Sequence, residues 1–343
     1  MACRSAAFIL KNVNQSKYNL FALGIDHKGD WYLQDTKKLL SSITTTTPIE
    51  TNQKISVSIE SLLKILDVTR DQLVVIPSLH GAFGEDGTLQ GMLEMSQIAY
   101  VGPDTLASSV CMDKEITKRL VAQVGIPIVP FKAFRDYEWQ SKRQEIIKEL
   151  EKTLSYPMFV KPANSGSAVG VNKAKNSDDL IKACEAALQN DDKILVEKAM
   201  DAHEIEFAVM GNYEPRVSTP GEVQIKGEFF NYQEKYSAAS TQEFVIPAPI
   251  GAEKIKEGQE LTKRAWKALQ LHGLSRIDWF LCRKTNVYHL NEVNTIPGFT
   301  AISGFPLMWK HDGLSGEQVI NDLIGYARER HNTKMKLQRT YCE

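Results

Sequence analysis

The segment from residue 161 to 170 has a composition suited to binding an anion. It reads Lys-Pro-Ala-Asn-Ser-Gly-Ser-Ala-Val-Gly, so a lysine at the end of an apolar run is followed by small residues and two glycines. Such a loop can turn successive backbone N–H groups toward one anion while the lysine adds a positive charge. It fits neither the P-loop pattern nor the dinucleotide pattern G-x-G-x-x-G. Taken alone, the segment predicts either a phosphate-binding loop or a flexible turn between two strands.

A second group of polar residues lies on two predicted strands, 274–282 and 287–294. Side chains two positions apart share one face of a strand, so Glu292 and Asn294 point the same way. Asp278 on the preceding strand could converge with them. Oxygen ligands of this kind suit Mg²⁺ that bridges phosphates. The alternative is a half-exposed hairpin with paired charges, which the anion-binding loop upstream makes less attractive.

The elements that must position these residues alternate between strand and helix, which is typical of an α/β fold. Further strands are predicted at residues 73–77, 98–102, 158–161, 193–197 and 206–210. Helices are predicted at residues 87–95, 113–124, 142–152, 178–189, 252–271 and 315–330. The last helix opens with Ser315 and Gln318 at capping-box spacing, and the basic residues beyond Arg328 are predicted to be its solvated end. Residues 41–47 are predicted to form a surface loop.

The composition excludes several classes of protein. The chain has 343 residues with 41 Lys and Arg against 42 Asp and Glu, so no overall charge favours nucleic acid as a partner. No apolar run approaches the roughly 20 residues of a membrane span. The five cysteines are scattered, without a C-x-x-C pair. We therefore expect a cytoplasmic globular protein of two or three domains that binds neither nucleic acid nor membrane.

Six motifs in a fixed order give the chain a resemblance to the D-alanine–D-alanine ligases of the ATP-grasp superfamily. They lie at residues 80–91 (His-Gly-Ala-Phe-Gly-Glu-Asp-Gly-Thr-Leu-Gln-Gly), 112–114, 161–170, 234–236, 276–278 and 291–300. The resemblance implies an α/β, three-domain ATP-grasp architecture with an N-terminal open α/β domain. The expected divisions are residues 1–112, 113–201 and 202–343, and the family suggests a homodimer.

The resemblance also implies a reaction. ATP would phosphorylate the carboxylate of one D-alanine, and the amine of a second D-alanine would attack the acyl phosphate to give D-alanyl-D-alanine for peptidoglycan precursors. Two Mg²⁺ ions, replaceable by Mn²⁺, are the expected metals. The alternatives are a D-alanine–D-serine ligase, another ATP-grasp carboxylate–amine ligase, or a catalytically weak nucleotide-binding remnant.

Matching positions carry the family's nucleotide-binding roles onto this chain. They are Lys114, Lys161 and Ser167 for the phosphates, Glu197, Lys198 and Met200 for the adenine, and Glu204 for the ribose. Lys235 and Tyr236 match the family's mobile loop, Lys235 toward the nucleotide and Tyr236 among the catalytic residues.

Other matching positions carry the substrate and metal roles. Asp278, Glu292 and Asn294 would hold the metal ions, and His80 would lie near the first D-alanine. The alternative for His80 is a buried histidine bonded to backbone. Arg276 and the N–H of Gly298 would stabilise the acyl phosphate and the tetrahedral intermediate, with Ser167 among the catalytic residues and Ser303 on the second substrate.

Three departures from the family pattern stand out. The chain begins at what looks like the family's first helix, so the preceding strand, glycine-rich turn and glutamate have no counterpart, and the first domain is expected to be incomplete at its start. Ala168 stands where the family's loop usually has a second serine. Gly304 follows Ser303 where many members have a larger apolar residue, which predicts a roomier pocket for the second substrate.

Overall fold

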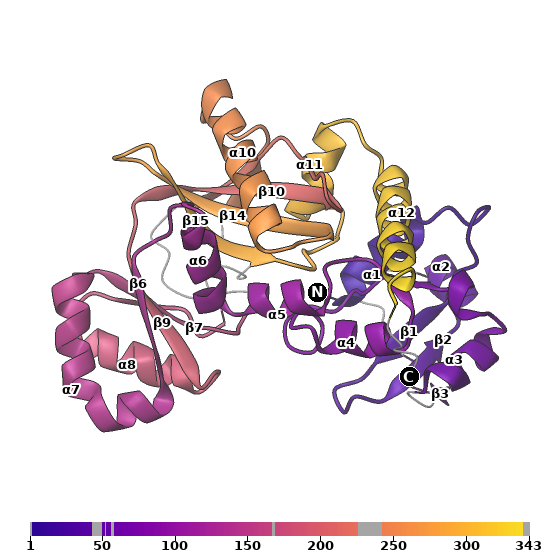
Figure 1. Ribbon diagram of the computed structural model, residues 1–343, viewed down its shortest axis with the longest axis horizontal. Helices are drawn as coiled ribbons and strands as arrows, with labels where there is room; N and C mark the ends of the chain where they lie inside the picture. The colour runs from indigo at the N-terminus through magenta and orange to yellow at the C-terminus, as the bar shows by residue number, and fades with distance from the viewer. Residues whose placement is uncertain are drawn as a thin grey trace.

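A computed structural model of the chain describes residues 2–42, 50–51, 53–55, 58–166, 169–225 and 242–338. Across these ranges the strands form four separate sheets. In Figure 1 the sheet of β1 (Ala22–Ile25), β2 (Trp31–Gln34) and β3 (Lys54–Ile55) and the four-stranded sheet that contains β6 (Phe131–Arg135) lie at opposite ends of the molecule. The largest sheet, which contains β10 (Ala202–Gly211), lies between and above them. No helix of the described ranges is long and apolar enough to cross a membrane.

The N-terminal part contains two small sheets and the helices that cover them. One is an antiparallel sheet of β1 (Ala22–Ile25), β2 (Trp31–Gln34) and β3 (Lys54–Ile55), which the sequence did not predict. The other pairs β4 (Val74–Val75) in parallel with β5 (Ala99–Tyr100). The helices are α1 (Ala2–Asn12), α2 (Thr36–Ser42), α3 (Ile59–Leu66), α4 (Thr88–Met95) and α5 (Thr105–Met112), with a 3-10 turn at Arg70–Gln72. Because α4 connects β4 to β5, the predicted strand–helix–strand unit is confirmed.

A four-stranded antiparallel sheet follows, in the order β6-β9-β7-β8. Its strands are β6 (Phe131–Arg135), β7 (Met158–Pro162), β8 (Asn172–Ala174) and β9 (Lys193–Lys198). The associated helices are α6 (Lys114–Gln123), α7 (Asp136–Thr153) and α8 (Ser177–Leu188). Trp139 of α7 and Leu180 of α8 are fully buried in one apolar cluster with Val160 and Val196 of the sheet. The predicted helices and both predicted strands of this region are confirmed, with α7 beginning earlier than expected.

The largest sheet is antiparallel and has the order β13-β12-β10-β14-β15, with β11 paired to β10. Its strands are β10 (Ala202–Gly211), β11 (Arg216–Val217), β12 (Gly221–Ile225), β13 (Gln242–Val245), β14 (Gly273–Cys282) and β15 (Tyr288–Asn294). Three helices pack around it: α10 (Ala252–Ala268), α11 (Gly304–His311) and α12 (Gly316–Met335). Ile277 and Trp279 of β14 are 0% exposed in the cluster that includes α10 residues. Alternation along β14 therefore presents Arg276 and Asp278 to the opposite face.

The last helix is capped as predicted but ends differently. Ser315 and Gln318 form the capping box. The basic end is solvated only in part: Lys336 is exposed, whereas Arg330 is 5% exposed and donates to the carbonyl oxygens of Tyr100 (3.1 Å) and Gly102. The guanidinium carbon of Arg330 lies 4.3 Å from the Tyr100 ring centroid. The prediction was wrong for Arg330, because the buried carbonyl groups of Tyr100 and Gly102 need donors that this side chain supplies. Of the predicted loop at 41–47, residues 41 and 42 end α2 and the others lie outside the described ranges.

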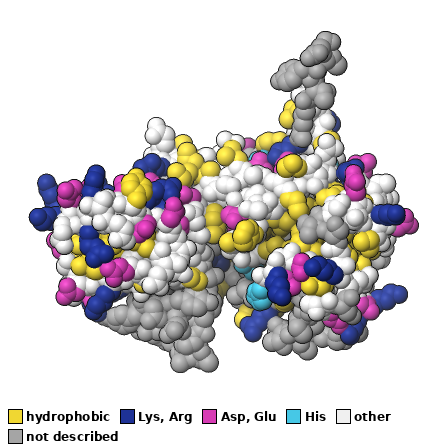
Figure 2. Space-filling model, turned by 90° about the horizontal axis from the view of Figure 1, so that it is seen from below, with side chains coloured by type: hydrophobic (Ala, Val, Ile, Leu, Met, Phe, Trp, Pro, Cys, Tyr) yellow, Lys and Arg dark blue, Asp and Glu magenta, His cyan; other side chains and the backbone are white. Residues whose placement is uncertain are grey.

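The face of the molecule seen in Figure 2 carries lysine and arginine side chains interspersed with aspartate and glutamate, and it is hollowed between the part around α7 and α8 and the N-terminal part. Neither sign of charge dominates this face, in keeping with the net charge of -1.

Candidate active site

The three predicted oxygen donors meet on one face of the β14–β15 pair. Asp278 stands opposite Glu292, and Arg276 stands opposite Asn294, with an irregularity in register just after Asp278. The Asn294 Nδ2 group donates to Asp278 Oδ2 over 2.9 Å, and Asp278 is only 1% exposed. Two carboxylates and an amide oxygen fit Mg²⁺, which completes its shell with waters and substrate oxygens.

Arg276 holds the central carboxylate in place. Its Nε and Nη2 groups donate to the two oxygens of Asp278 over 2.8 and 2.7 Å, and its Nε lies 3.2 Å from Glu206 Oε2. Burial opposes the charge of this guanidinium, but the adjacent carboxylates of Asp278 and Glu206 raise the pKa of Arg276 well above its usual value. Arg276 therefore stays cationic, and a bidentate pair of this kind is geometrically specific.

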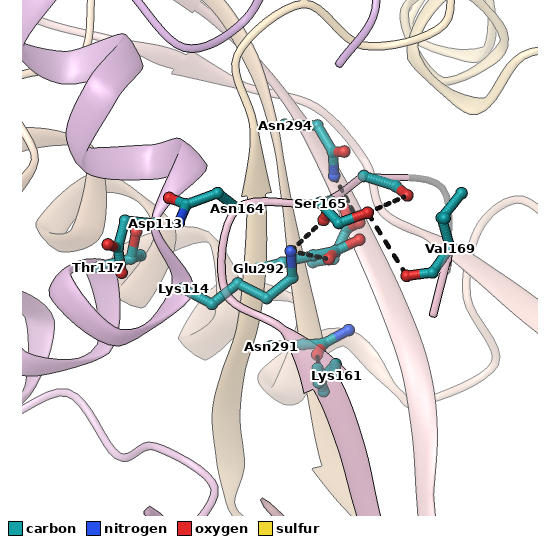
Figure 3. A network of polar contacts seen from close by, with 12 residues as sticks. Asp113, Lys114, Thr117, Lys161, Asn164, Ser165, Val169, Asn291, Glu292 and Asn294 are labelled. Atoms are coloured by element: carbon teal, nitrogen blue, oxygen red, sulfur yellow. Dashed lines mark hydrogen bonds and ion pairs between the residues drawn. The ribbon is translucent and has the colours of Figure 1, made fainter. Parts of the chain in front are cut away.

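Lys114 connects the anion-binding loop with the acidic face. It opens α6, and its backbone N–H donates to the Ala163 carbonyl over 3.1 Å. Its Nζ group donates to the Ser165 carbonyl and lies 4.0 Å from Glu292 Oε2, as Figure 3 shows. Burial lowers the pKa of Lys114. A cation is thus held between the loop and a predicted metal ligand.

Lys161 lies at the head of the loop in a buried cluster of charges. Its Nζ group is 2.6 Å from Glu197 Oε2 and 3.4 Å from Asn291 Oδ1. The other oxygen of Glu197 lies 2.9 Å from Nζ of Lys118. Burial acts to raise the pKa of Glu197, but the two lysines lower it to about 2, so the carboxylate is ionised. Glu197, expected beside the adenine, thus directs its carboxylate at two lysines.

The remaining predicted nucleotide contacts lie where β9 passes into β10. Lys198 is exposed at the end of β9, and Met200 is half-buried in the connection. Glu204 is on β10, where alternation places it on the same face as Glu206. Ser167, Ala168, Lys235 and Tyr236 lie outside the described residues.

His80, in the segment that follows β4, joins α1 to the loop after β15. Its Nδ1 atom is 3.0 Å from the Ile296 carbonyl and its Nε2 atom is 3.1 Å from Ser5 Oγ. Ser5 Oγ in turn accepts the N–H of Phe299 over 3.1 Å. Burial lowers the pKa of His80, which favours the neutral ring. The geometry matches the alternative of a histidine bonded to backbone, while keeping it next to Gly298.

Ser303 is the N-cap residue of α11, and its hydroxyl turns back to the loop. Ser303 Oγ accepts the N–H of Thr300 over 3.1 Å and lies 2.7 Å from Thr300 Oγ1. A Cβ atom built on Gly298 would stand 3.1 Å from Ser303 Oγ. Gly298 and Ser303 are therefore adjacent, as a shared substrate role requires.

The expectation of extra room at Gly304 is wrong. A Cβ atom at this position would stand 2.7 Å from Glu206 Oε2 and 2.9 Å from Cζ of Phe244. The space that a side chain would fill is already occupied by residues from β10 and β13. Gly304 therefore accommodates these two neighbours.

Four residues of this region were not predicted: Lys118, Glu206, Asn291 and Glu85. Glu85 Oε2 accepts the N–H of Gly81 over 2.5 Å, and its Oε1 accepts the N–H of Ile296 over 3.3 Å. Burial raises the pKa of Glu85 to about 7. Glu85 and Asn291 lie inside the 80–91 and 291–300 motifs, so both had a signal in the sequence, whereas Lys118 and Glu206 lie in none of the six motifs.

The fold, an α/β structure with a small N-terminal parallel pair and two antiparallel sheets that enclose lysines and carboxylates, is that of an ATP-grasp enzyme. Family models described as "D-ala D-ala ligase N-terminus" and "D-ala D-ala ligase C-terminus" match residues 1–103 and 120–325. The chain belongs to the D-alanine–D-alanine ligase family, so the predicted family, fold class and enzyme class are confirmed.

Individual relatives agree over nearly the whole chain. A D-alanine–D-alanine ligase of Thermoanaerobacter sp. (strain X514) is 40% identical over 97% of this chain and 93% of its own length. One from Caldicellulosiruptor bescii is 41% identical with the same coverage. Among solved structures, the VanG D-Ala:D-Ser ligase from Enterococcus faecalis has a TM-score of 0.81 at 33% identity, covering 95% of this chain and 94% of that one. The D-alanine–D-alanine ligase from Coxiella burnetii has a TM-score of 0.77 at 28% identity, covering 98% and 93%.

Proposed function

We propose that this chain joins two D-alanine molecules into D-alanyl-D-alanine at the expense of ATP, and that it does so in the cytoplasm for peptidoglycan precursors. One observation carries the proposal. Asp278, Glu292 and Asn294 lie on one face of β14 and β15, and the Nζ group of Lys114 lies between Glu292 and the Ser165 carbonyl of the 161–170 loop. Anionic and cationic groups on facing elements are what phosphoryl transfer requires, since it depends on positioning and charge neutralisation.

The residues divide the work in the following way. Lys114, Lys161 and Ser167 bind the phosphates of ATP, and Lys235 assists them. Glu197, Lys198 and Met200 line the adenine side, and Glu204 accepts the ribose hydroxyl groups, for which a carboxylate has two acceptor oxygens. Two Mg²⁺ ions, or Mn²⁺ in their place, would be held by Asp278, Glu292 and Asn294 and would supply charge neutralisation at the transferred phosphoryl group.

The substrates would react between Arg276 and the loop that carries Gly298. The carboxylate of the first D-alanine, near His80, takes the terminal phosphoryl group of ATP and ADP leaves. The amine of the second D-alanine, held by Ser303, attacks the acyl carbon, and phosphate leaves. Arg276 and the Gly298 N–H stabilise the negative charge that develops, and Tyr236 helps to close the site against water.

The proposal extends to the organisation of the chain. A division at 1–112, 113–201 and 202–343 is supported by the distribution of the sheets, because β1 to β5, β6 to β9 and β10 to β15 fall into these ranges in turn. A homodimer is the proposed assembly, with ATP and D-alanine as the small-molecule partners and neither nucleic acid nor membrane among them.

A coupled assay of ADP release tests the activity. We expect release that depends on D-alanine and Mg²⁺, with D-alanyl-D-alanine identified by mass spectrometry. ADP release that does not respond to D-alanine would refute the proposal.

D-serine as acceptor is the second candidate, favoured by the 33% identity to the VanG D-Ala:D-Ser ligase. Equimolar D-alanine and D-serine in one reaction decide between them, because the two dipeptides differ in mass. We expect D-alanyl-D-alanine to dominate.

A further inference from the structure

Lys118 is a fully buried lysine with no role in the mechanism above. It lies on α6, and its side chain is 0% exposed. Its Nζ group is 2.9 Å from Glu197 Oε1 and donates to the Leu290 carbonyl over 3.2 Å. A lysine is almost never fully buried unless it is paired, because desolvating its charge is costly. The contacts with Glu197 and with the Leu290 carbonyl must therefore compensate for the cost of burying this charge.

The contacts of Lys118 link three elements that each carry a residue of the proposed site. Its own helix begins with Lys114. Glu197 is on β9, which pairs with the strand of Lys161. Leu290 is on β15, two residues before Glu292. Through Glu197 and the Leu290 carbonyl, the ammonium group of Lys118 thus connects the elements that carry Lys114, Lys161 and Glu292.

The charges in this cluster do not balance. Glu197 is 2% exposed and lies between Lys118 at 2.9 Å and Lys161 at 2.6 Å. Two ammonium groups share one carboxylate, which leaves one positive charge over. If Lys118 were neutral, Glu197 would offset the charge of Lys161 alone, and Lys161 would attract an anion less strongly.

We infer that Lys118 is a positioning residue for nucleotide binding. Because Lys118 shares the carboxylate of Glu197, Lys161 keeps positive charge for the nucleotide phosphates, and the ammonium group of Lys161 stays in place at the start of the 161–170 loop. The inference rests on the proposed function for the identity of the nucleotide. It assigns Lys118 no contact with substrate, and its effect passes through Glu197 and Lys161.

The main test compares Lys118→Met, which removes the charge and keeps the length, with Lys118→Arg, which keeps the charge. Arg119→Met is the matched control, because Arg119 is the next residue of α6, is 69% exposed and also loses a positive charge. We expect Lys118→Met to raise the KM for ATP at least tenfold, with kcat and the KM for D-alanine within threefold. Lys118→Arg should recover most of the ATP affinity, and Arg119→Met should leave all three constants within twofold.

Lys118→Gln separates charge sharing from a loss of structure, because a glutamine amide can still donate to the Leu290 carbonyl but carries no charge. We expect Lys118→Gln to bind ATP as weakly as Lys118→Met does. ATP binding by Lys118→Gln within threefold of the parent would overturn the inference, as would a KM for ATP that Lys118→Met leaves unchanged. If Lys118→Met fails to fold, Lys118→Gln alone decides the inference by the same threefold limit.

Direct titration with a fluorescent ATP analogue in the presence of Mg²⁺ keeps this test independent of turnover. If the parent chain binds the analogue but releases no ADP with D-alanine, the proposed ligation fails while the inference about Lys118 can still be judged from the affinities. If the parent turns over normally and Lys118→Met binds the analogue as the parent does, the inference alone fails.

Discussion

Gly304 lies against Glu206, so that a methyl group on Gly304 would stand 2.7 Å from a carboxylate oxygen of Glu206. The same oxygen is 3.2 Å from Nε of Arg276. A side chain at residue 304 must therefore displace a carboxylate that helps to hold the arginine proposed to stabilise the reacting oxyanion. Glu206 thus links the backbone of Gly304 to Arg276, the residue proposed to stabilise the oxyanion.

Enlarging this glycine should reduce activity. We expect Gly304→Leu to lower kcat/KM for D-alanine at least tenfold, because Glu206 and Phe244 must both move, and Gly304→Ala to have a smaller effect in the same direction. Steady-state ADP release measures both. Gly325→Ala on α12 is the control, since a Cβ there meets nothing within 4 Å, and it should leave the rate unchanged. Full activity in Gly304→Leu would mean that Glu206 can move away without consequence.

Glu292→Gln should abolish turnover. The substitution keeps the size of the side chain but removes a charge that faces Lys114 at 4.0 Å and is predicted to bind metal. The rate of ADP release, measured across a Mg²⁺ titration, should fall at least a hundredfold and should not recover at high Mg²⁺. Glu260→Gln, a carboxylate 60% exposed on α10, should stay within twofold of the parent. Near-normal rates in Glu292→Gln would refute the metal assignment.

Removing Arg330 should destabilise the protein without touching the candidate site. Arg330→Met leaves the carbonyl groups of Tyr100 and Gly102 without their buried donor, which typically costs about 1–3 kcal/mol. Urea unfolding measures the loss. The exposed Arg328 of the same helix provides the control, and Arg328→Met should change stability by less than about 0.5 kcal/mol. Equal stability of the two variants would show that the buried donor is dispensable.

Glu85 should make stability depend on pH below neutrality. Burial raises its pKa from 4.5 to about 7, so between these values the folded protein binds a proton that the unfolded chain does not. The contribution is therefore fully present below about pH 4.5 and is lost as pH rises to about 7, at up to about 1.4 kcal/mol per pH unit. We expect the free energy of unfolding of Glu85→Gln, measured by urea at pH 5, 6 and 7, to fall less with pH than that of the parent. Parallel curves would contradict this.

The part of the site that lies on long strands could be predicted from the sequence. Period-2 alternation places Glu292 and Asn294 on one face of β15 and places Asp278 on the face of β14 opposite the buried Ile277 and Trp279. The antiparallel pairing of β14 with β15 then brings the three side chains to one face. The prediction of the strand–helix–strand unit around α4 rests on a different signal, two short apolar runs on either side of a helical segment.

What the sequence left out depends on how elements dock. Lys118 looks like any charged residue of an amphipathic helix, and only the packing of α6 between β9 and β15 buries it. Gly304 suggested extra space, but its neighbours Glu206 and Phe244 come from strands far away in the chain. The strands β1 and β3 are four and two residues long, too short for their alternation to be read.

The packing of α12 on α1 affects how the chain must be made. Ile9 and Val13 near the start of the chain share an apolar cluster with Ile320, Leu323 and Ile324 of α12, and Figure 1 shows the two helices side by side. At 5–20 residues per second, a ribosome needs roughly 15 to 60 seconds to travel from one to the other. During that time the apolar side chains of α1 have none of their α12 partners. A nascent chain halted before α12 would keep this part of the apolar surface of α1 uncovered.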